Sequence, residues 1–164
     1  MASCLVGSEM CIRDSAATSD GTTMSSEILD DYEEGNWNAT LVPQTSGTVS
    51  VSSDGCQYVK IGQLVHLSGL VQTNSASSPV GVMRMGGFPF ACANLDDYGG
   101  RTCAAINIQS AAIPPYRWGM WTTEGEAYGS IYNFTTSSEQ PQSTGANQFG
   151  GNESIYFNLT IRTT

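Results

Sequence analysis

The sequence predicts an all-β protein, an antiparallel β-sandwich or jelly roll of about eight to nine strands. Charged residues make up only 13% of the 164 residues, while glycine occurs 18 times. No long window has the alanine, leucine, glutamate and lysine content of a stable helix. Short stretches of alternating apolar and polar residues recur instead, with turn residues between them about every eight to twelve positions.

The chain divides into a polar arm, residues 1–27, and a folded domain, residues 28–164. Residues 16–27 are rich in Ser, Thr, Asp and Gly, and they bury too little apolar surface to offset the entropy of ordering. Residues 4–15 resemble a translated transposon adapter from sequencing libraries, so they are left out of fold reasoning. We therefore expect the arm to be disordered, Met1 not to be the natural start, and the chain to be a fragment.

The domain opens on an acidic and aromatic segment that we call the neck. Its residues are Asp30, Asp31, Tyr32, Glu33, Glu34, Gly35 and Trp37. We expect Tyr32, Gly35 and Trp37 to be structural, with a bend at Gly35 and a buried Trp37 indole. The four carboxylates are expected to stay exposed, because neighbours on a strand point to opposite faces and their spacing is not that of a calcium loop.

Strand patterns follow the neck in a regular series. The expected strands are residues 39–42, 48–52, 57–61, 64–73, 80–85, 103–109, 116–122, 127–134 and 154–162. Turn residues at 53–55 separate the second and third of these. The polar stretches 74–78, 94–101 and 137–151 are expected to be loops, which are candidate binding surfaces on a rigid scaffold.

Alternation predicts which faces of two strands are buried. On residues 64–73, Val65, Leu67 and Val71 share one face, and Leu64, His66 and Leu70 share the other. Both faces carry apolar groups, so we expect this strand to be central in a sheet and covered on both sides. On the last strand Ile155, Phe157, Leu159 and Ile161 are expected to point inward.

The sequence indicates no catalytic residue, no metal site and no cofactor. His66 is the only histidine, and a packed or surface residue is favoured over a general base. Outside residues 4–15 the cysteines are Cys56, Cys92 and Cys103, which lack metal-ligand spacing. They are expected to be small, partly buried thiols, with a Cys92–Cys103 disulfide as the alternative. We therefore do not expect an enzyme.

Net charge and hydropathy exclude two classes of partner. The formal charge is −9, and a chain this acidic repels nucleic acid and anionic lipid. No run of about 18 apolar residues is present, so we expect no membrane insertion.

Two groups of residues are candidates for ligand binding. Tyr116, Trp118 and Trp121 lie on one expected strand, with Tyr116 and Trp118 on one face and Trp121 on the other. Carbohydrate-binding proteins stack sugar rings on exposed aromatics. The alternative is that one aromatic face is core and the other lies at a subunit interface. The second group, Asp96, Asp97 and Tyr98, lies in an exposed turn.

The neck carries a resemblance to a known family. Residues 29–41 read LDDYEEGNWNATL, which resembles the LDDYEEGTWTPT sequence that opens the C-terminal domain of many bacteriophage tail-fibre and tail-spike-like proteins. Residues 58–62, 64–67, 87–90 and 159–163 continue the match, so the resemblance spans about residues 28–164. The sequence departs from the family pattern at Asn36, Asn38, Ala39 and Phe88.

The resemblance implies a virion protein at the distal, extracellular end of a tail fibre. It implies a homotrimer that recognises a receptor on the host-cell surface, either a glycan or a protein. A trimer interface would also cover the second apolar face of residues 64–73. The alternatives are a free carbohydrate-binding module and a fragment of a polysaccharide depolymerase.

Overall fold

The computed structural model describes residues 32–110, 117–134 and 145–164. The expected disordered arm, the exposure of Asp30 and Asp31, and the candidate Tyr116 lie outside the described residues. These described residues contain nine strands: β1 (Tyr32–Asn36), β2 (Thr40–Pro43), β3 (Ser46–Ile61), β4 (Leu64–Val80), β5 (Met83–Gly86), β6 (Cys103–Gln109), β7 (Arg117–Thr122), β8 (Tyr128–Phe134) and β9 (Ser154–Arg162). Two short 3-10 helices, η2 (Asp96–Tyr98) and η3 (Gly145–Gln148), lie between strands.

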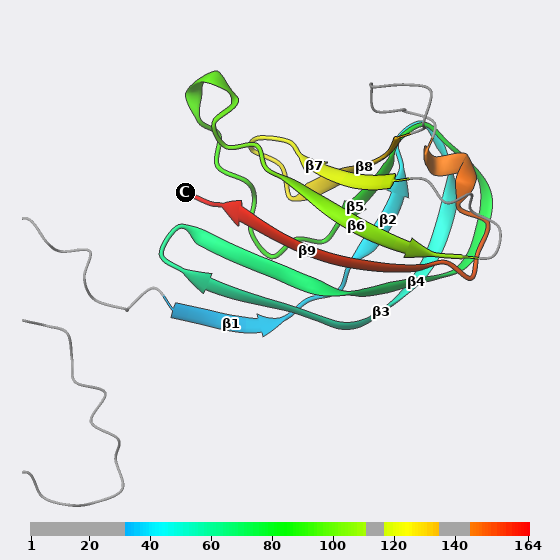
Figure 1. Cartoon of the computed structure of the whole chain (residues 1–164), viewed down its shortest axis with the longest axis horizontal. Helices are drawn as coiled ribbons and strands as arrows, with labels where there is room; N and C mark the ends of the chain where they lie inside the picture. The colour runs from blue at the N-terminus through cyan, green and yellow to red at the C-terminus, as the bar shows by residue number, and fades with distance from the viewer. Residues whose placement is uncertain (1–31, 111–116, 135–144) are drawn as a thin grey trace, which may run out of the picture.

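All nine strands belong to one antiparallel sheet in the order β1-β3-β4-β9-β6-β7-β8-β5-β2. The all-β antiparallel class and the expected number of strands are confirmed. The sheet curls into a half-barrel, in which β7, β8, β5 and β2 lie across the core from β3 and β4 (Figure 1). The two layers expected of a sandwich are thus two arms of one continuous sheet, and register shifts within β3 and β4 help to bend it,.

The hairpin of β3 and β4 differs most from the sequence prediction. Residues 48–52 and 57–61 form one strand, and the expected turn at 53–55 is an irregularity between Asp54 and Gln57. The expected loop 74–78 lies within β4, where Ser75 pairs with Ser50 and Ser77 with Thr48. Hydrogen bonds to a neighbouring strand outweigh the weak strand preference of these polar residues, which local pattern alone does not show.

The core lies on the concave face of the curled sheet. Val65, Leu67 and Val71 are fully buried, and the inward residues of β9 are buried as expected. β4 is central, between β3 and β9. The described residues do not cover all of its second face, however, because Leu64 is 56% exposed and His66 is exposed as well. Within the described part of the chain, the expectation of cover on both sides was therefore wrong.

Trp37 joins the two arms of the sheet. Its indole is only 8% exposed and makes edge contacts with Phe88, at 5.5 Å between centroids, and Phe157, at 5.8 Å. Its Nε1 donates a hydrogen bond to the carbonyl of Gln57 at 3.2 Å. The predicted burial of Trp37 is confirmed, as is the exposure of Glu33 and Glu34.

Gly35 does not provide the expected bend. It lies inside β1, opposite Tyr58 of β3. A Cβ at this position would lie 2.8 Å from the Tyr58 ring. The glycine is therefore required for close approach of the Tyr58 side chain, and the bend assigned to it was wrong.

A buried carboxylate fixes the segment that leads into β9. Glu153 is fully buried and accepts hydrogen bonds from the Thr73 hydroxyl and from the backbone N–H groups of Gly150 and Gly151, the latter two at 3.1 and 3.0 Å. The Glu153 backbone N–H donates to the Thr73 hydroxyl at 2.8 Å. These bonds satisfy the carboxylate inside the protein and connect this segment to β4.

Candidate ligand-binding hollow

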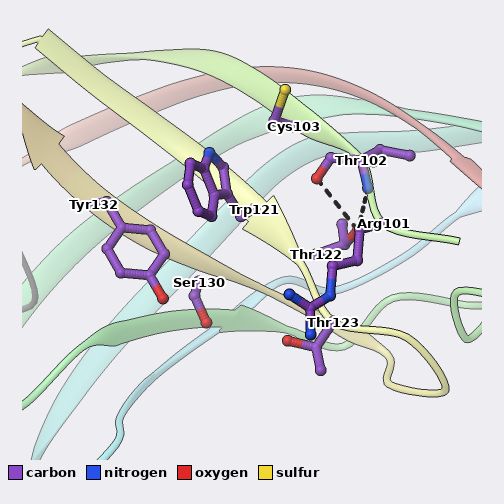
Figure 2. A pocket seen from close by; sticks show the side chains of 8 residues that line it. All are labelled: Arg101, Thr102, Cys103, Trp121, Thr122, Thr123, Ser130 and Tyr132. Atoms are coloured by element: carbon purple, nitrogen blue, oxygen red, sulfur yellow. Dashed lines mark hydrogen bonds between the residues drawn. The ribbon is translucent and has the colours of Figure 1, made fainter. Parts of the chain in front are cut away.

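Three neighbouring strands build a hollow on the outer face of the sheet. The register places Trp121 of β7 between Cys103 of β6 and Ser130 of β8, and directly opposed residues share one face. We call this site the Trp121 hollow. Its volume is about 490 Å³, and it is lined by Arg101, Thr102, Cys103, Trp121, Thr122, Thr123, Ser130 and Tyr132 (Figure 2).

Two aromatic rings form one wall of the Trp121 hollow. The Trp121 side chain is 44% exposed, and its ring centroid lies 5.5 Å from that of Tyr132 at an interplanar angle of 51°. Hydroxyl groups of Thr123, Ser130 and Tyr132 also line the hollow. An aromatic face beside several hydroxyls matches a sugar, which presents an apolar ring face and polar edges.

Arg101 connects the Trp121 hollow to the loop that contains η2. Its guanidinium carbon lies 4.1 Å from the centroid of the exposed Tyr98 ring. The neighbouring Gly100 N–H donates to the Glu124 carboxylate at 2.8 Å, which ties this loop to the turn between β7 and β8. Tyr98 thus lies next to the hollow through Arg101, whereas Asp96 and Asp97 are exposed in η2 and are not among its lining residues.

The two tryptophans of β7 have opposite environments, as alternation predicted. Trp118 is buried and packs against Phe149 at 6.0 Å between centroids. Its ring is part of the core and is not presented to a ligand in this structure. Of the aromatic candidates on this strand within the described residues, Trp121 alone is exposed.

Thr122 supports the hollow from the inner side of β7. Its hydroxyl accepts a hydrogen bond from the Thr102 N–H at 2.8 Å and donates one to the Thr102 carbonyl at 3.3 Å. Burial raises the pKa of the nearby Cys92 thiol, and a hydrogen bond with Thr122 partly opposes this shift,. Cys92 is buried, Cys103 is exposed in the hollow, and no disulfide joins them.

The described residues offer little for metal or acid–base chemistry. Within ranges 32–110, 117–134 and 145–164, no group of three or more His, Cys, Asp or Glu side chains is placed to hold a metal ion. His66 is exposed on β4, with Nδ1 3.1 Å from the Thr160 hydroxyl, as favoured for a surface histidine. Nor does that part of the chain contain a helix long and apolar enough to cross a membrane.

Sequence reasoning found Trp121 but missed most of the residues around it. Arg101 and Cys103 come from one segment, and Ser130 and Tyr132 come from another. The sheet register brings these two segments to either side of Trp121. The alternation within β8 places Ser130 and Tyr132 on one face, and the sequence alone could have indicated this. Nothing local to β8 shows that β7 lies beside it.

The half-barrel described above is found in a known protein. Its fold is similar to part of the crystal structure of the Dettilon tailspike protein, with a TM-score of 0.67 and 13% sequence identity over 80% of this chain. The match covers 24% of the tailspike chain, so this chain spans about a quarter of that protein's length. No protein-family model and no curated protein matches the sequence. The structural neighbour is a phage tail protein, in agreement with the tail-spike-like resemblance of the sequence.

Proposed function

We propose that this chain is a structural and receptor-binding domain of a bacteriophage tail, exposed on the virion, and that the Trp121 hollow binds a host-surface glycan. The fold similarity to a phage tailspike and the sequence resemblance support the first part. One observation carries the second part: the exposed Trp121 ring, tilted against Tyr132 in a hollow with hydroxyl groups. A sugar would stack on the indole while its hydroxyls exchange hydrogen bonds with the lining residues.

Assembly into a homotrimer would increase the strength of such binding. Each hollow would contribute a weak contact, and three linked sites raise the overall avidity. The exposed apolar side chains of Ile61, Leu64 and Tyr156 on the outer side of β3, β4 and β9 support this proposal, since exposed apolar groups are commonly buried at subunit interfaces. Light scattering after size exclusion tests it, and a strict monomer would count against the assembly.

We propose binding rather than hydrolysis as the role of the hollow. A glycoside hydrolase of the common kind needs two carboxyl groups on either side of the bond that it cleaves. None of the described lining residues of the Trp121 hollow is a carboxylate, and Oε1 of the neighbouring Glu124 accepts a hydrogen bond from Gly100. Release of shorter products from a bound polysaccharide would favour the depolymerase alternative instead.

The direct test compares two exposed aromatic residues on different strands. Binding of the intact chain, Trp121→Ala and Tyr32→Ala is measured on an array of bacterial surface glycans. Tyr32 is 49% exposed on β1, at the edge of the sheet, so it is a matched control for Trp121. We expect Trp121→Ala to weaken binding at least about tenfold, which corresponds to roughly 1.4 kcal/mol, and Tyr32→Ala to leave it unchanged. Equal binding by Trp121→Ala would show that the hollow is not the site.

A further inference from the structure

We infer that the glycan bound in the Trp121 hollow is acidic, with a sugar carboxylate on Arg101 and a sugar ring on Trp121. This inference rests on the proposed function and adds the chemical class of the ligand. It starts from an unequal distribution of charge in an acidic chain. The whole sequence has 15 acidic and six basic residues.

Three of the five basic residues in the described part of the chain lie in β5, in β7 and directly before β6, the part of the sheet that contains the hollow. Arg101 lines it. Arg117 is exposed on β7, four residues before Trp121 and therefore on the same face,. Arg84 of β5 pairs with Ser130, a lining residue of the hollow, and its guanidinium carbon lies 4.7 Å from the Tyr128 ring centroid. The outer face of these strands thus concentrates positive charge.

The acidic residues are distributed differently. The strands β5, β6, β7 and β8 contain no Asp or Glu, whereas the short strand β1 contains Glu33 and Glu34. Among the described residues that connect these strands, the acidic side chains are Asp96, Asp97, Glu124 and Glu126. A ligand lying on the strands therefore meets arginines, and an anionic ligand gains from this placement.

Arg101 is also accessible to a carboxylate ligand, because it is exposed and lines the hollow. Its guanidinium carbon lies over the Tyr98 ring, 4.1 Å from the centroid, and no ion pair joins Arg101 to a carboxylate of the described residues. Stacking holds the plane of a guanidinium while its N–H edge remains able to bind a carboxylate through two parallel hydrogen bonds. Arg162 differs, because its Nε and Nη2 atoms already donate to Oε1 of Gln63 at 3.1 and 2.8 Å.

The hollow has room for a ligand that contacts both groups. Its volume of about 490 Å³ lies within the range of roughly 300–1,000 Å³ that is usual for small-molecule sites. Figure 2 shows the Trp121 and Tyr132 rings on one side and the Arg101 side chain beside Thr123 on the other. A sugar stacked on the aromatic rings can therefore direct a carboxylate towards Arg101.

Cys103 provides a way to measure occupancy of this site. Its thiol is exposed and lines the hollow directly opposite Trp121. A bound saccharide should slow its alkylation by iodoacetamide, followed for the Cys103 peptide by mass spectrometry. Cys92, which is buried, is the internal control for unfolding. The carboxylated probes are oligosaccharides of polysialate, alginate and polygalacturonate, and each is compared with the same oligosaccharide after its carboxylates are reduced to alcohols. Dextran and maltooligosaccharides are the neutral probes, and dextran sulfate is the sulfated probe.

We expect at least one carboxylated probe to protect Cys103 and its reduced form to protect at least tenfold less at equal concentration. Arg101→Gln should remove the preference for the acidic form, whereas Arg162→Gln, which removes the same charge elsewhere, should retain it.

Equal protection by acidic and neutral probes, or an unchanged preference in Arg101→Gln, would overturn the inference and leave the proposed function standing. Protection by dextran sulfate alone would assign the anion to a sulfate and overturn the carboxylate. Protection by none of the probes would count against both proposals.

Discussion

Trp37 and Trp121 are the same type of residue in two opposite environments. The Trp37 indole lies between the arms of the curled sheet, with Phe88 and Phe157 against it and its N–H bonded to the Gln57 carbonyl. The Trp121 indole lies on the outer face, tilted against Tyr132 and open to solvent. The first therefore stabilises the fold, and the second is available to a ligand.

The difference shows that the register of the strands, and not the residue type, decides the role of each aromatic side chain. Trp118 and Trp121 are three positions apart on β7, so they point to opposite faces,. Trp118 lies in the core beside Phe149, and Trp121 lies in the hollow. Substitutions at core and hollow positions should therefore separate loss of stability from loss of binding.

The largest effect is expected for Trp37→Ala. Removing this buried indole leaves a cavity between the two arms of the sheet, and such substitutions lower the free energy of unfolding by about 3–5 kcal/mol. Urea unfolding followed by circular dichroism measures the loss, and Trp37→Phe should lose less. A loss below about 1 kcal/mol would mean that Trp37 does not hold the arms together.

A smaller loss of stability is expected for Glu153→Gln. The side-chain amide keeps the shape of the carboxylate but replaces one acceptor oxygen with a donor, which cannot accept from both Gly150 and Gly151,. Loss of hydrogen bonds to a buried charged group lowers the free energy of unfolding by about 2–3 kcal/mol. The same urea titration measures it, with exposed Glu33→Gln as the matched control. Equal midpoints for the two variants would contradict the structural role of Glu153.

Trp121→Ala should have little effect on stability. Its side chain is largely outside the core, so we expect the free energy of unfolding to change by less than about 1 kcal/mol, while glycan binding weakens at least about tenfold. Measuring both quantities on the same preparation sharpens the contrast with Trp37. A destabilisation as large as that of Trp37→Ala would show that the indole of Trp121 is structural.

The smallest effect concerns the neck at alkaline pH. The Tyr58 hydroxyl donates to the Glu33 carboxylate at 2.6 Å, and this hydrogen bond raises the pKa of Tyr58, with a further contribution from burial. The neutral phenol is the form that the folded state favours. The contribution of this hydrogen bond to the free energy of unfolding is therefore complete below the unfolded pKa of about 10. It is lost as pH rises through the higher pKa of the folded state. Phenolate absorbance is measured against pH for the wild type and for Tyr58→Phe. The difference between the two curves should show one group titrating above pH 10. Titration of that group at or below pH 10 would contradict the contact.

The sequence was most informative where strand alternation coincides with a single buried face. The bounds of β6 and β9 and the inward residues of β9 agree with the prediction, as does the burial of Trp37. It was least informative in polar segments such as residues 74–78, which have the composition of a loop and yet pair with β3. Their conformation depends on a partner strand that is distant in sequence.

The all-β class followed from the sequence. So did the division of each strand's residues between two faces, and with it the difference between Trp118 and Trp121, because side chains alternate along any strand. Only the tertiary structure decided that one sheet curls into a half-barrel, that Gly35 makes room for Tyr58, and that Arg101 lies beside Trp121. These features depend on which strands are neighbours. Neighbours are fixed by long-range hydrogen bonding and packing, which no local pattern contains.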